Sequence, residues 1–136
     1  MKEKTIIICG KEVKMIYCAA TENGYEFIAG KSIDVFIPKF GKNEKGEDII
    51  AEPANATRAD YMMLGIAGIT AYYSKQDEEP PVVSKDILYD ATPTEVANLI
   101  TSIVELRAAW YGIPKVVENQ LKEEQGNKTD EEKPKN

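Results

Sequence analysis

The residues most suggestive of chemistry are Gly30, Lys31 and Ser32, which have the types and order that close a nucleotide-binding P-loop. A P-loop opens with a glycine five positions before that closing glycine, so that backbone N–H groups can curl around the phosphates. Tyr25 occupies this position, and the segment after Ser32, IDVFIPKFG, contains a proline and favours extended chain over the helix that a P-loop opens. We therefore interpret Gly30 as the C-terminal stop of a short helix and not as part of a phosphate site.

Other patterns that indicate catalysis or metal binding are missing from the sequence. Histidine is absent from the 136 residues, which removes the commonest general base and the commonest zinc ligand. The segment NEKGEDIIAE lacks the alternating ligands of a calcium-binding loop, and runs of acids such as QDEEPP are usually solvated surface. We therefore expect no catalytic residue, no metal and no cofactor. The alternative, an unrecognised enzyme, would need acids that converge in a deep pocket.

The charge balance argues against a nucleic-acid-binding surface. The 17 Lys and Arg residues are outnumbered by 23 Asp and Glu residues, which gives a net charge of -6. The charged N-terminus lacks the long apolar run of a signal peptide, and the longest uncharged stretch, residues 61–73, is too short to span a bilayer. We therefore expect a cytoplasmic protein that binds neither nucleic acid nor membrane.

The chain begins with the pattern of a β-hairpin. Gly10 and Lys11 lie between two apolar runs and predict a two-residue turn, which would pair Cys9 with Glu12. In this register Cys9 and Cys18 lie about 20 Å apart at ~3.3 Å per residue, too far for a disulfide, so we expect two free thiols. The expected core face of the hairpin consists of Ile6, Ile8, Val13, Met15 and Tyr17.

Two helices and a loop are expected next. A short helix is predicted over residues 19–29, and the charged, glycine-rich segment 39–48 predicts an exposed loop. Thr57 is the expected N-cap of a longer helix that runs to about Ser74. This helix is apolar nearly all round, so it is either central in the core or part of an interface. Its narrow apolar face consists of Met62, Ile66, Ile69 and Tyr73, and its small-residue back of Leu64, Ala67, Gly68 and Ala71.

The last part of the chain contains the clearest helix signal. A short helix in SKDILYD is expected to be capped by Ser84, and residues 92–95, Thr-Pro-Thr-Glu, form a capping box with proline at the first helical position. This final helix should end at Gly112. Arg107 lies among its apolar residues, where it either extends to solvent, pairs with an acid at the edge of the core, or contacts a ligand. The apolar stripe consists of Val96, Leu99, Ile100, Ile103, Leu106 and Trp110.

Together these elements predict an α+β fold, in which an N-terminal antiparallel β-hairpin packs on three to four α-helices. We expect a single domain over residues 1–117. The polar, acidic residues 118–136 have little apolar surface to offset the entropy of ordering, so we expect a largely disordered tail.

The order of these segments has a counterpart in a known family. The hairpin TIIICGKEVKMIYCAA precedes YEFIAGKSIDVF, in which a helix ends in Gly-Lys-Ser; an aspartate then leads into the helix of ADYMMLGIAGITAYY, and a last helix ends in ELRAAWYGIP. This arrangement, over about residues 4–112, resembles the small tail assembly chaperones of long-tailed phages and prophages. The insertion IPKFGKNEKGEDIIAEP departs from the shorter members of that family.

The resemblance implies a non-enzymatic protein of the bacterial host cytoplasm that coats the long, helical tape measure protein and keeps it soluble until the tail tube polymerises. A homo-oligomer is possible. Such a protein needs adaptable apolar surface, which methionine and aromatic residues supply. The alternatives are a structural tail-completion or connector protein of a phage particle, and a small cytoplasmic adaptor or regulatory protein unrelated to phage. The candidate partner-binding residues are Met62, Met63, Tyr72, Tyr73, Trp110 and Tyr111.

Overall fold

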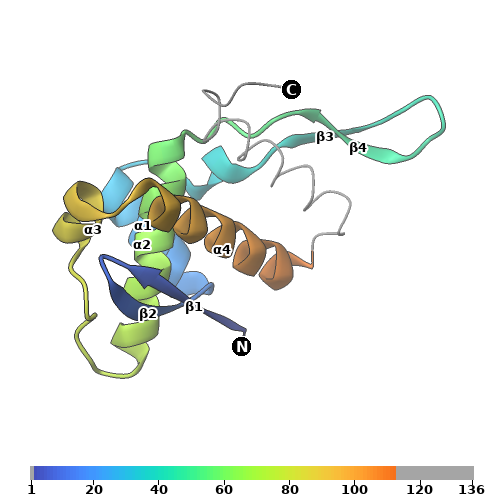
Figure 1. The fold of residues 1–136 in the computed structure, drawn as a ribbon. Coiled ribbons are helices and arrows are strands. Elements are labelled where there is room, and N and C mark those ends of the chain that lie inside the picture. The colour runs from blue at the N-terminus through green and yellow to red at the C-terminus, as the bar shows by residue number, and fades with distance from the viewer. Residues whose placement is uncertain (1, 113–136) are drawn as a thin grey trace.

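The computed structural model describes residues 2–112 of the chain (Figure 1). The predicted α+β class is confirmed, because an N-terminal antiparallel hairpin packs on α-helices. The predicted tail, residues 118–136, and the end of the predicted domain lie outside the described residues. In chain order the elements are β1 (Glu3–Ile8), β2 (Lys11–Ile16), α1 (Ala19–Ala29), the 3-10 helix η1 (Ile33–Phe36), β3 (Lys39–Lys42), β4 (Asp48–Glu52), α2 (Arg58–Lys75), α3 (Ser84–Asp90) and α4 (Pro93–Tyr111).

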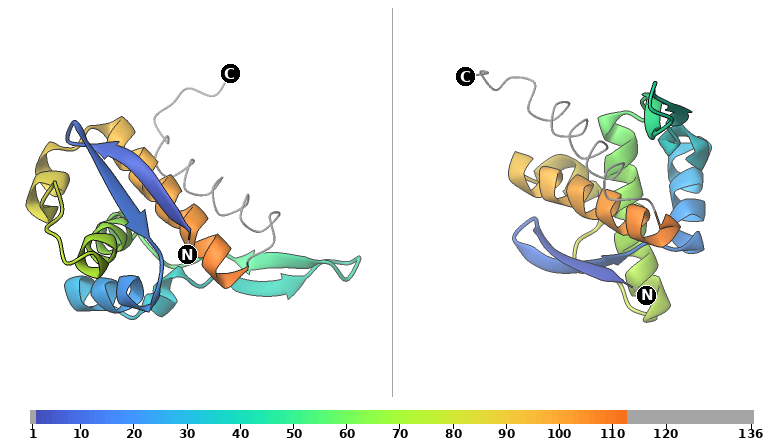
Figure 2. Two further views of the ribbon diagram at one scale, coloured as in Figure 1. Left: turned by 90° about the horizontal axis from the view of Figure 1, so that it is seen from below. Right: turned by 90° about the vertical axis from the view of Figure 1, so that its right-hand side faces the viewer.

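Helix α2 is the centre of the fold, with α1, α4 and strand β2 packed against it (Figure 2). It begins where predicted: the Thr57 hydroxyl accepts a hydrogen bond from the Asp60 N–H at 3.2 Å, and the Asp60 carboxylate accepts one from the Thr57 N–H at 2.8 Å. Such a capping box satisfies N–H groups that the first helical turn leaves without partners. Most of α2 is buried, so its all-round apolar character reflects a core position.

Small residues of α2 allow its neighbours to approach closely. Ala67 faces Gly24 of α1, where a methyl group built on the glycine would lie 3.5 Å from the alanine Cβ. A methyl group on Gly68 would lie 2.8 Å from the Ile103 side chain of α4 and 2.9 Å from the Ile16 carbonyl oxygen of β2. The face of α2 that was predicted to carry small residues is therefore the face on which α1, α4 and β2 pack.

The register of the first hairpin differs from the prediction. The turn residues are Cys9 and Gly10, with φ of 51° and 74°, so Ile8 pairs with Lys11 and the predicted pairing of Cys9 with Glu12 is wrong. Two positive φ values suit a type I′ turn, which matches the twist of the strands and in which glycine often takes the second position. Each β1 residue therefore pairs with a β2 residue two positions earlier than predicted, and a shift of two residues leaves every side chain on the same face of the hairpin. The core face is therefore as predicted, with Ile6, Ile8, Val13, Met15 and Tyr17 all buried.

Residues 39–48 were expected to form an exposed loop, and this is wrong in part because they belong to a second hairpin. Its strands β3 and β4 pair with each other and project away from the body of the protein (Figures 1 and 2). In the connection, the Asn43 side-chain oxygen accepts hydrogen bonds from the N–H groups of Lys45 and Glu47, both at 2.9 Å, and Gly46 has a φ of 77°. Local turn chemistry thus forms a hairpin in a segment that lacks an alternating apolar pattern.

The last two helices begin and end close to the predicted positions. The residue before α3 is Val83, which provides no side-chain cap, so the expected cap by Ser84 is wrong. The capping box of α4 is confirmed, since Thr92 and Glu95 exchange hydrogen bonds at 3.2 and 2.9 Å. Gly112 ends α4 with a φ of 67°. The predicted stripe of α4 is buried except for its last member, Trp110.

Candidate functional site

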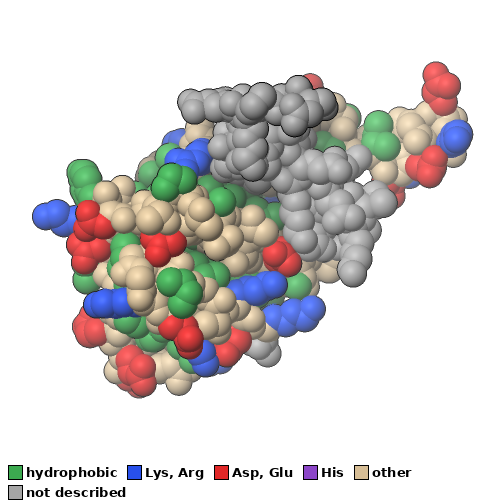
Figure 3. Space-filling model, in the orientation of Figure 1, with side chains coloured by type: hydrophobic (Ala, Val, Ile, Leu, Met, Phe, Trp, Pro, Cys, Tyr) green, Lys and Arg blue, Asp and Glu red, His purple; other side chains and the backbone are tan. Residues whose placement is uncertain are grey.

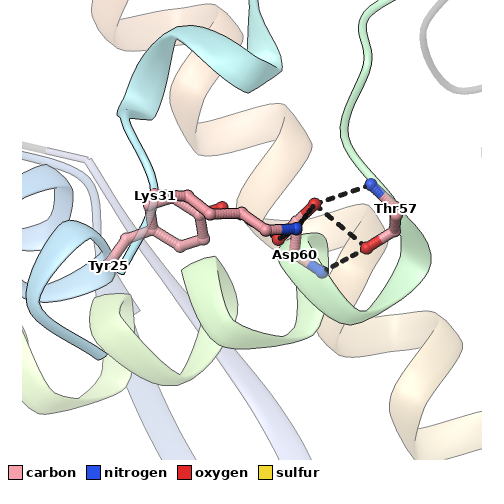
Figure 4. A network of polar contacts seen from close by, with 4 residues as sticks. All are labelled: Tyr25, Lys31, Thr57 and Asp60. Atoms are coloured by element: carbon pink, nitrogen blue, oxygen red, sulfur yellow. Dashed lines mark hydrogen bonds and ion pairs between the residues drawn. The ribbon is translucent and has the colours of Figure 1, made fainter. Parts of the chain in front are cut away.

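Each of the three residues of the Gly-Lys-Ser corner after α1 has a structural role, and Figure 4 shows that of Lys31. Gly30 ends α1 with a φ of 66°, a left-handed conformation that glycine adopts without strain. The Ser32 hydroxyl accepts a hydrogen bond from the Asp34 N–H at 3.1 Å and caps η1. The Lys31 ammonium lies 3.1 and 3.2 Å from the two carboxylate oxygens of Asp60.

Asp60 is the buried end of this ion pair, with only 1% of its surface exposed. Burial opposes ionisation of this carboxyl, but hydrogen bonds from the Thr57 N–H, the Lys31 ammonium, the Tyr25 hydroxyl and the Thr57 hydroxyl outweigh it and lower its pKa. The hydroxyl contacts are 2.9 Å to Tyr25 and 3.0 Å to Thr57. A buried charge is tolerated when it is paired and hydrogen-bonded in this way. The corner therefore ties the end of α1 to the start of α2, and its lysine is already engaged.

An open hollow beside the first hairpin turn brings together Asp86, Asp90 and Glu95. An unrecognised enzyme would require acidic side chains that converge in this way. Backbone N–H groups, first that of Thr92 and then that of Gly10, lower the pKa of the Glu95 carboxyl. The contact to the Gly10 N–H is 3.1 Å and docks the hairpin turn on the start of α4. Glu95 is thus held ionised by structural contacts, which is unsuitable for a general acid.

Cys9 borders the same hollow, and its Sγ lies 3.5 Å from the Asp86 carbonyl oxygen. Burial, followed by the charges of Glu95, Asp90 and Asp86, raises the pKa of the thiol. A thiol of raised pKa is a weak nucleophile and a weak metal ligand. Both cysteines of the chain are free, as predicted. Within residues 2–112, no group of three or more acidic or cysteine side chains is placed to hold a metal ion.

The six residues predicted to bind a partner fall into three environments. Met62 and Tyr73 are core residues, with 9% and 8% of their surface exposed, so they are not available at the surface. Met63 and Tyr72 are half-buried, and the Lys14 ammonium lies 5.9 Å from the Tyr72 ring centre. The surface aromatic pair of the set comes from the end of α4, where Trp110 and Tyr111 are 46% and 50% exposed.

The aromatic pair belongs to a cluster, here called the α4-end cluster, that consists of Tyr17, Glu22, Arg107, Trp110 and Tyr111. The buried Tyr17 ring lies 5.4 Å from the Trp110 ring and 6.2 Å from the Tyr111 ring. The Glu22 carboxylate, on α1, accepts a hydrogen bond from the Tyr17 hydroxyl at 2.6 Å and another from the Tyr111 hydroxyl. Burial and the Glu22 hydrogen bond raise the pKa of Tyr111 to about 12. The exposed rings are therefore held in place from beneath.

Arg107 contributes a buried cation to the α4-end cluster. It is 8% exposed, its guanidinium carbon lies 5.0 Å from the centre of the Tyr111 ring, and its Nε has no hydrogen-bond partner. We expected this side chain to extend to solvent, to pair with an acid or to contact a ligand. The first two alternatives are wrong for residues 2–112, because the side chain is buried and forms no ion pair within them. A cation–π contact with Tyr111 takes the place of a salt bridge.

Sequence reasoning missed the most exposed aromatic side chain of the described chain. Phe27, on α1, is 90% exposed, and its neighbour Ile28 is 50% exposed. A helical projection of α1 would have indicated this position, because Phe27 lies about 200° from Tyr25 at 100° per residue and so opposite the buried side. Figure 3 shows charged and apolar side chains interspersed over one face of the molecule, with both charge signs on the projecting hairpin.

No family model, curated protein or solved structure matches this chain. Within residues 2–112, no helix is both long enough and apolar enough to cross a bilayer.

Proposed function

We propose that this protein is a phage or prophage tail assembly chaperone, a non-enzymatic protein that binds the tape measure protein and keeps it soluble during tail assembly. The observation that carries the proposal is the α4-end cluster, where Trp110 and Tyr111 are half-exposed yet fixed over the buried Tyr17. Tryptophan and tyrosine are enriched among the residues that dominate protein–protein binding energy. Rigid aromatic side chains also lose little conformational entropy on binding.

The surface beside Trp110 fits an apolar side chain of a helical partner. A hollow of about 190 Å³ lies between the end of α4 and the two residues that flank the first hairpin, Lys2 and Tyr17. An amphipathic helix binds by placing apolar residues into such hollows one turn apart. A long helical protein that waits for its tail tube has such an apolar stripe to cover. The hollow is lined by Lys2, Tyr17, Leu106, Ala109 and Trp110.

The contact between Lys31 and Asp60 adds support to the resemblance on which the family assignment rests. The resemblance includes a helix that ends in Gly-Lys-Ser and an aspartate that leads into the next helix. Here the lysine of the first motif is bonded to the aspartate of the second, at 3.1 Å. The two motifs therefore act as one structural unit, which gives a physical reason for them to occur together.

The test is co-expression with a candidate tape measure protein, a long coiled-coil protein sought among those encoded beside this one, scored by solubility and co-purification. We expect the long protein to become soluble only with its small neighbour, and the two to elute together. Trp110→Ser should reduce co-purification at least tenfold, because it removes the exposed ring. Tyr89→Ser is the matched control: it removes a more exposed aromatic, 79%, from α3. That helix lies at the other end of α4, about 28 Å away for a helix of this length.

Other outcomes identify the alternatives. If the long protein stays insoluble and this chain is found in purified particles, it is a structural tail-completion or connector protein. If it is absent from particles and ignores the long protein, it is an adaptor unrelated to phage. Equal losses from Trp110→Ser and Tyr89→Ser would show that general stickiness, and not the α4-end cluster, holds the partner.

A further inference from the structure

The β3–β4 hairpin is a ribbon that extends beyond the body of the protein (Figures 1 and 2). Among residues 2–112 each of its strands pairs only with the other, so each has one edge without a strand neighbour. Ile50 packs against the core at its base, whereas Phe40 is 54% exposed. An isolated two-stranded ribbon is marginally stable in water, and an open edge is a template for another strand. A further strand would therefore stabilise the hairpin, and the open strand edges provide a position at which it can pair.

Charge is divided between the two strands. The charged residues of β3 are Lys39 and Lys42, and those of β4 are Asp48 and Glu52. Within the hairpin they form cross-strand ion pairs, at 3.1 Å between Lys39 and Glu52 and at 2.7 Å between Lys42 and Asp48. The ribbon thus has one basic edge and one acidic edge.

This division selects among the possible strand pairings between two copies of the chain. Pairing β3 with β3 of another copy would set lysines against lysines, and pairing β4 with β4 would set acids against acids. Like charges directly opposite each other destabilise an antiparallel pair, and opposite charges stabilise it. Pairing β3 of one copy with β4 of the next is therefore favoured. It is also antiparallel when both hairpins point the same way, so the pattern repeats from copy to copy.

We propose that the β3–β4 hairpin is a self-assembly arm whose basic strand pairs with the acidic strand of a second copy of this chain. The contact is head to tail, so it forms rings when the rotation between copies closes and helical rows when it does not. Main-chain hydrogen bonds supply the attraction, and Phe40 gains an apolar neighbour on the extended sheet. Strands of four and five residues make each joint weak, so assembly depends on protein concentration. This proposal does not rest on the proposed function.

Charge-swapped chains provide a sharp test. Lys39→Glu and Lys42→Glu, together with Asp48→Lys and Glu52→Lys, exchange the two edges while keeping the ion pairs within the hairpin and the net charge. We expect the wild-type and the swapped chain each to form oligomers of increasing mass as concentration rises in sedimentation velocity. In pull-down, a tagged wild-type chain should retain untagged wild-type chain, and a tagged swapped chain should retain untagged swapped chain. A hairpin with only the two Lys→Glu changes should stay monomeric.

Each contrary result overturns the proposal. A wild-type chain that remains monomeric up to millimolar concentration has no self-assembly arm. A swapped chain that stays monomeric although its two edges are still complementary shows that copies of the wild-type join through another surface. Oligomers of the all-acidic hairpin show the same. Because the hairpin projects from the body, thermal unfolding of the variants should match that of the wild-type and so exclude unfolding of the body as the cause. The swapped chain keeps both cross-strand ion pairs, so it controls for loss of the hairpin itself.

Discussion

Gly68→Ala tests whether the close approach of three elements at α2 determines the stability of the fold. Alanine in place of glycine inside a helix is favourable by about 1 kcal/mol. Here the added Cβ would lie 2.8 Å from Ile103 Cδ1 and 2.9 Å from the Ile16 carbonyl oxygen. Ile103 is fully buried, and that oxygen already accepts a hydrogen bond from the Thr21 hydroxyl at 3.0 Å. Neither neighbour can move away without disturbing further contacts.

Overpacking of a core typically costs about 1–3 kcal/mol, and a rigid backbone oxygen places this site in the upper part of that range. After subtraction of the helix-propensity gain of about 1 kcal/mol, we expect a net loss of about 1–2 kcal/mol. This corresponds to a decrease in melting temperature of about 4–12 °C for a domain of this size. Urea unfolding followed by circular dichroism measures the free energy of unfolding, and a thermal scan measures the melting temperature.

Gly24→Ala is the matched control, since it makes the same change inside another helix at another helix contact. There the new Cβ would lie 3.5 Å from the Ala67 Cβ, an ordinary packing distance, so we expect no loss and a gain of up to about 1 kcal/mol. Gly65→Ala should lie between the two, because its close neighbour, at 2.7 Å, is the Leu99 side chain and not backbone. A Gly68→Ala protein as stable as the wild-type would refute the packing argument.

Two further predictions concern the buried carboxylate of Asp60. Its pKa is lowered in the folded state, so its ionised form stabilises the fold above the unfolded-state pKa of about 3.9, and this contribution is lost as pH falls through the lower folded-state pKa. The difference in urea midpoint between the wild-type and Asp60→Asn should therefore shrink between about pH 5 and pH 2; a constant difference contradicts the ion-pair account. Lys31→Met should lower the free energy of unfolding at pH 7 by about 1–3 kcal/mol, since it removes a partner of a buried charge. Lys45→Met, in the exposed second hairpin turn, serves as the control and should leave it unchanged.

The parts of the fold that could be predicted from sequence are those set by neighbours along the chain. The N-cap at Thr57 and the capping box at Thr92 each involve a residue three positions away, and the stops at Gly30 and Gly112 depend on one residue's freedom to adopt positive φ. The register of the first hairpin is local too, yet Gly10 fits either the first or the second position of a two-residue turn. The sequence pattern therefore predicted which side chains of that hairpin face the core, but not which residues pair across its two strands.

The parts that could not be predicted depend on residues far apart in the chain. The role of Lys31 depends on Asp60, and that of Glu22 on Tyr111, so neither follows from its own surroundings. In α2 the narrow apolar face contained Met62 and Tyr73, which are buried. A helix that is apolar nearly all round does not show which of its methionines and tyrosines remain at the surface.

The two proposals use separate parts of the chain and bear on each other through geometry. A head-to-tail row joined by β3–β4 hairpins would present every α4-end cluster in the same orientation relative to its neighbour, because one rotation and translation relates all copies. A long helical partner repeats its apolar stripe along its axis, so once one cluster binds, the next meets its target at a high effective concentration. Weak individual contacts would then hold a long partner firmly while allowing stepwise release. Assembly through one element and binding through another is therefore physically consistent with the proposed role, in which the protein covers a long partner and later leaves it.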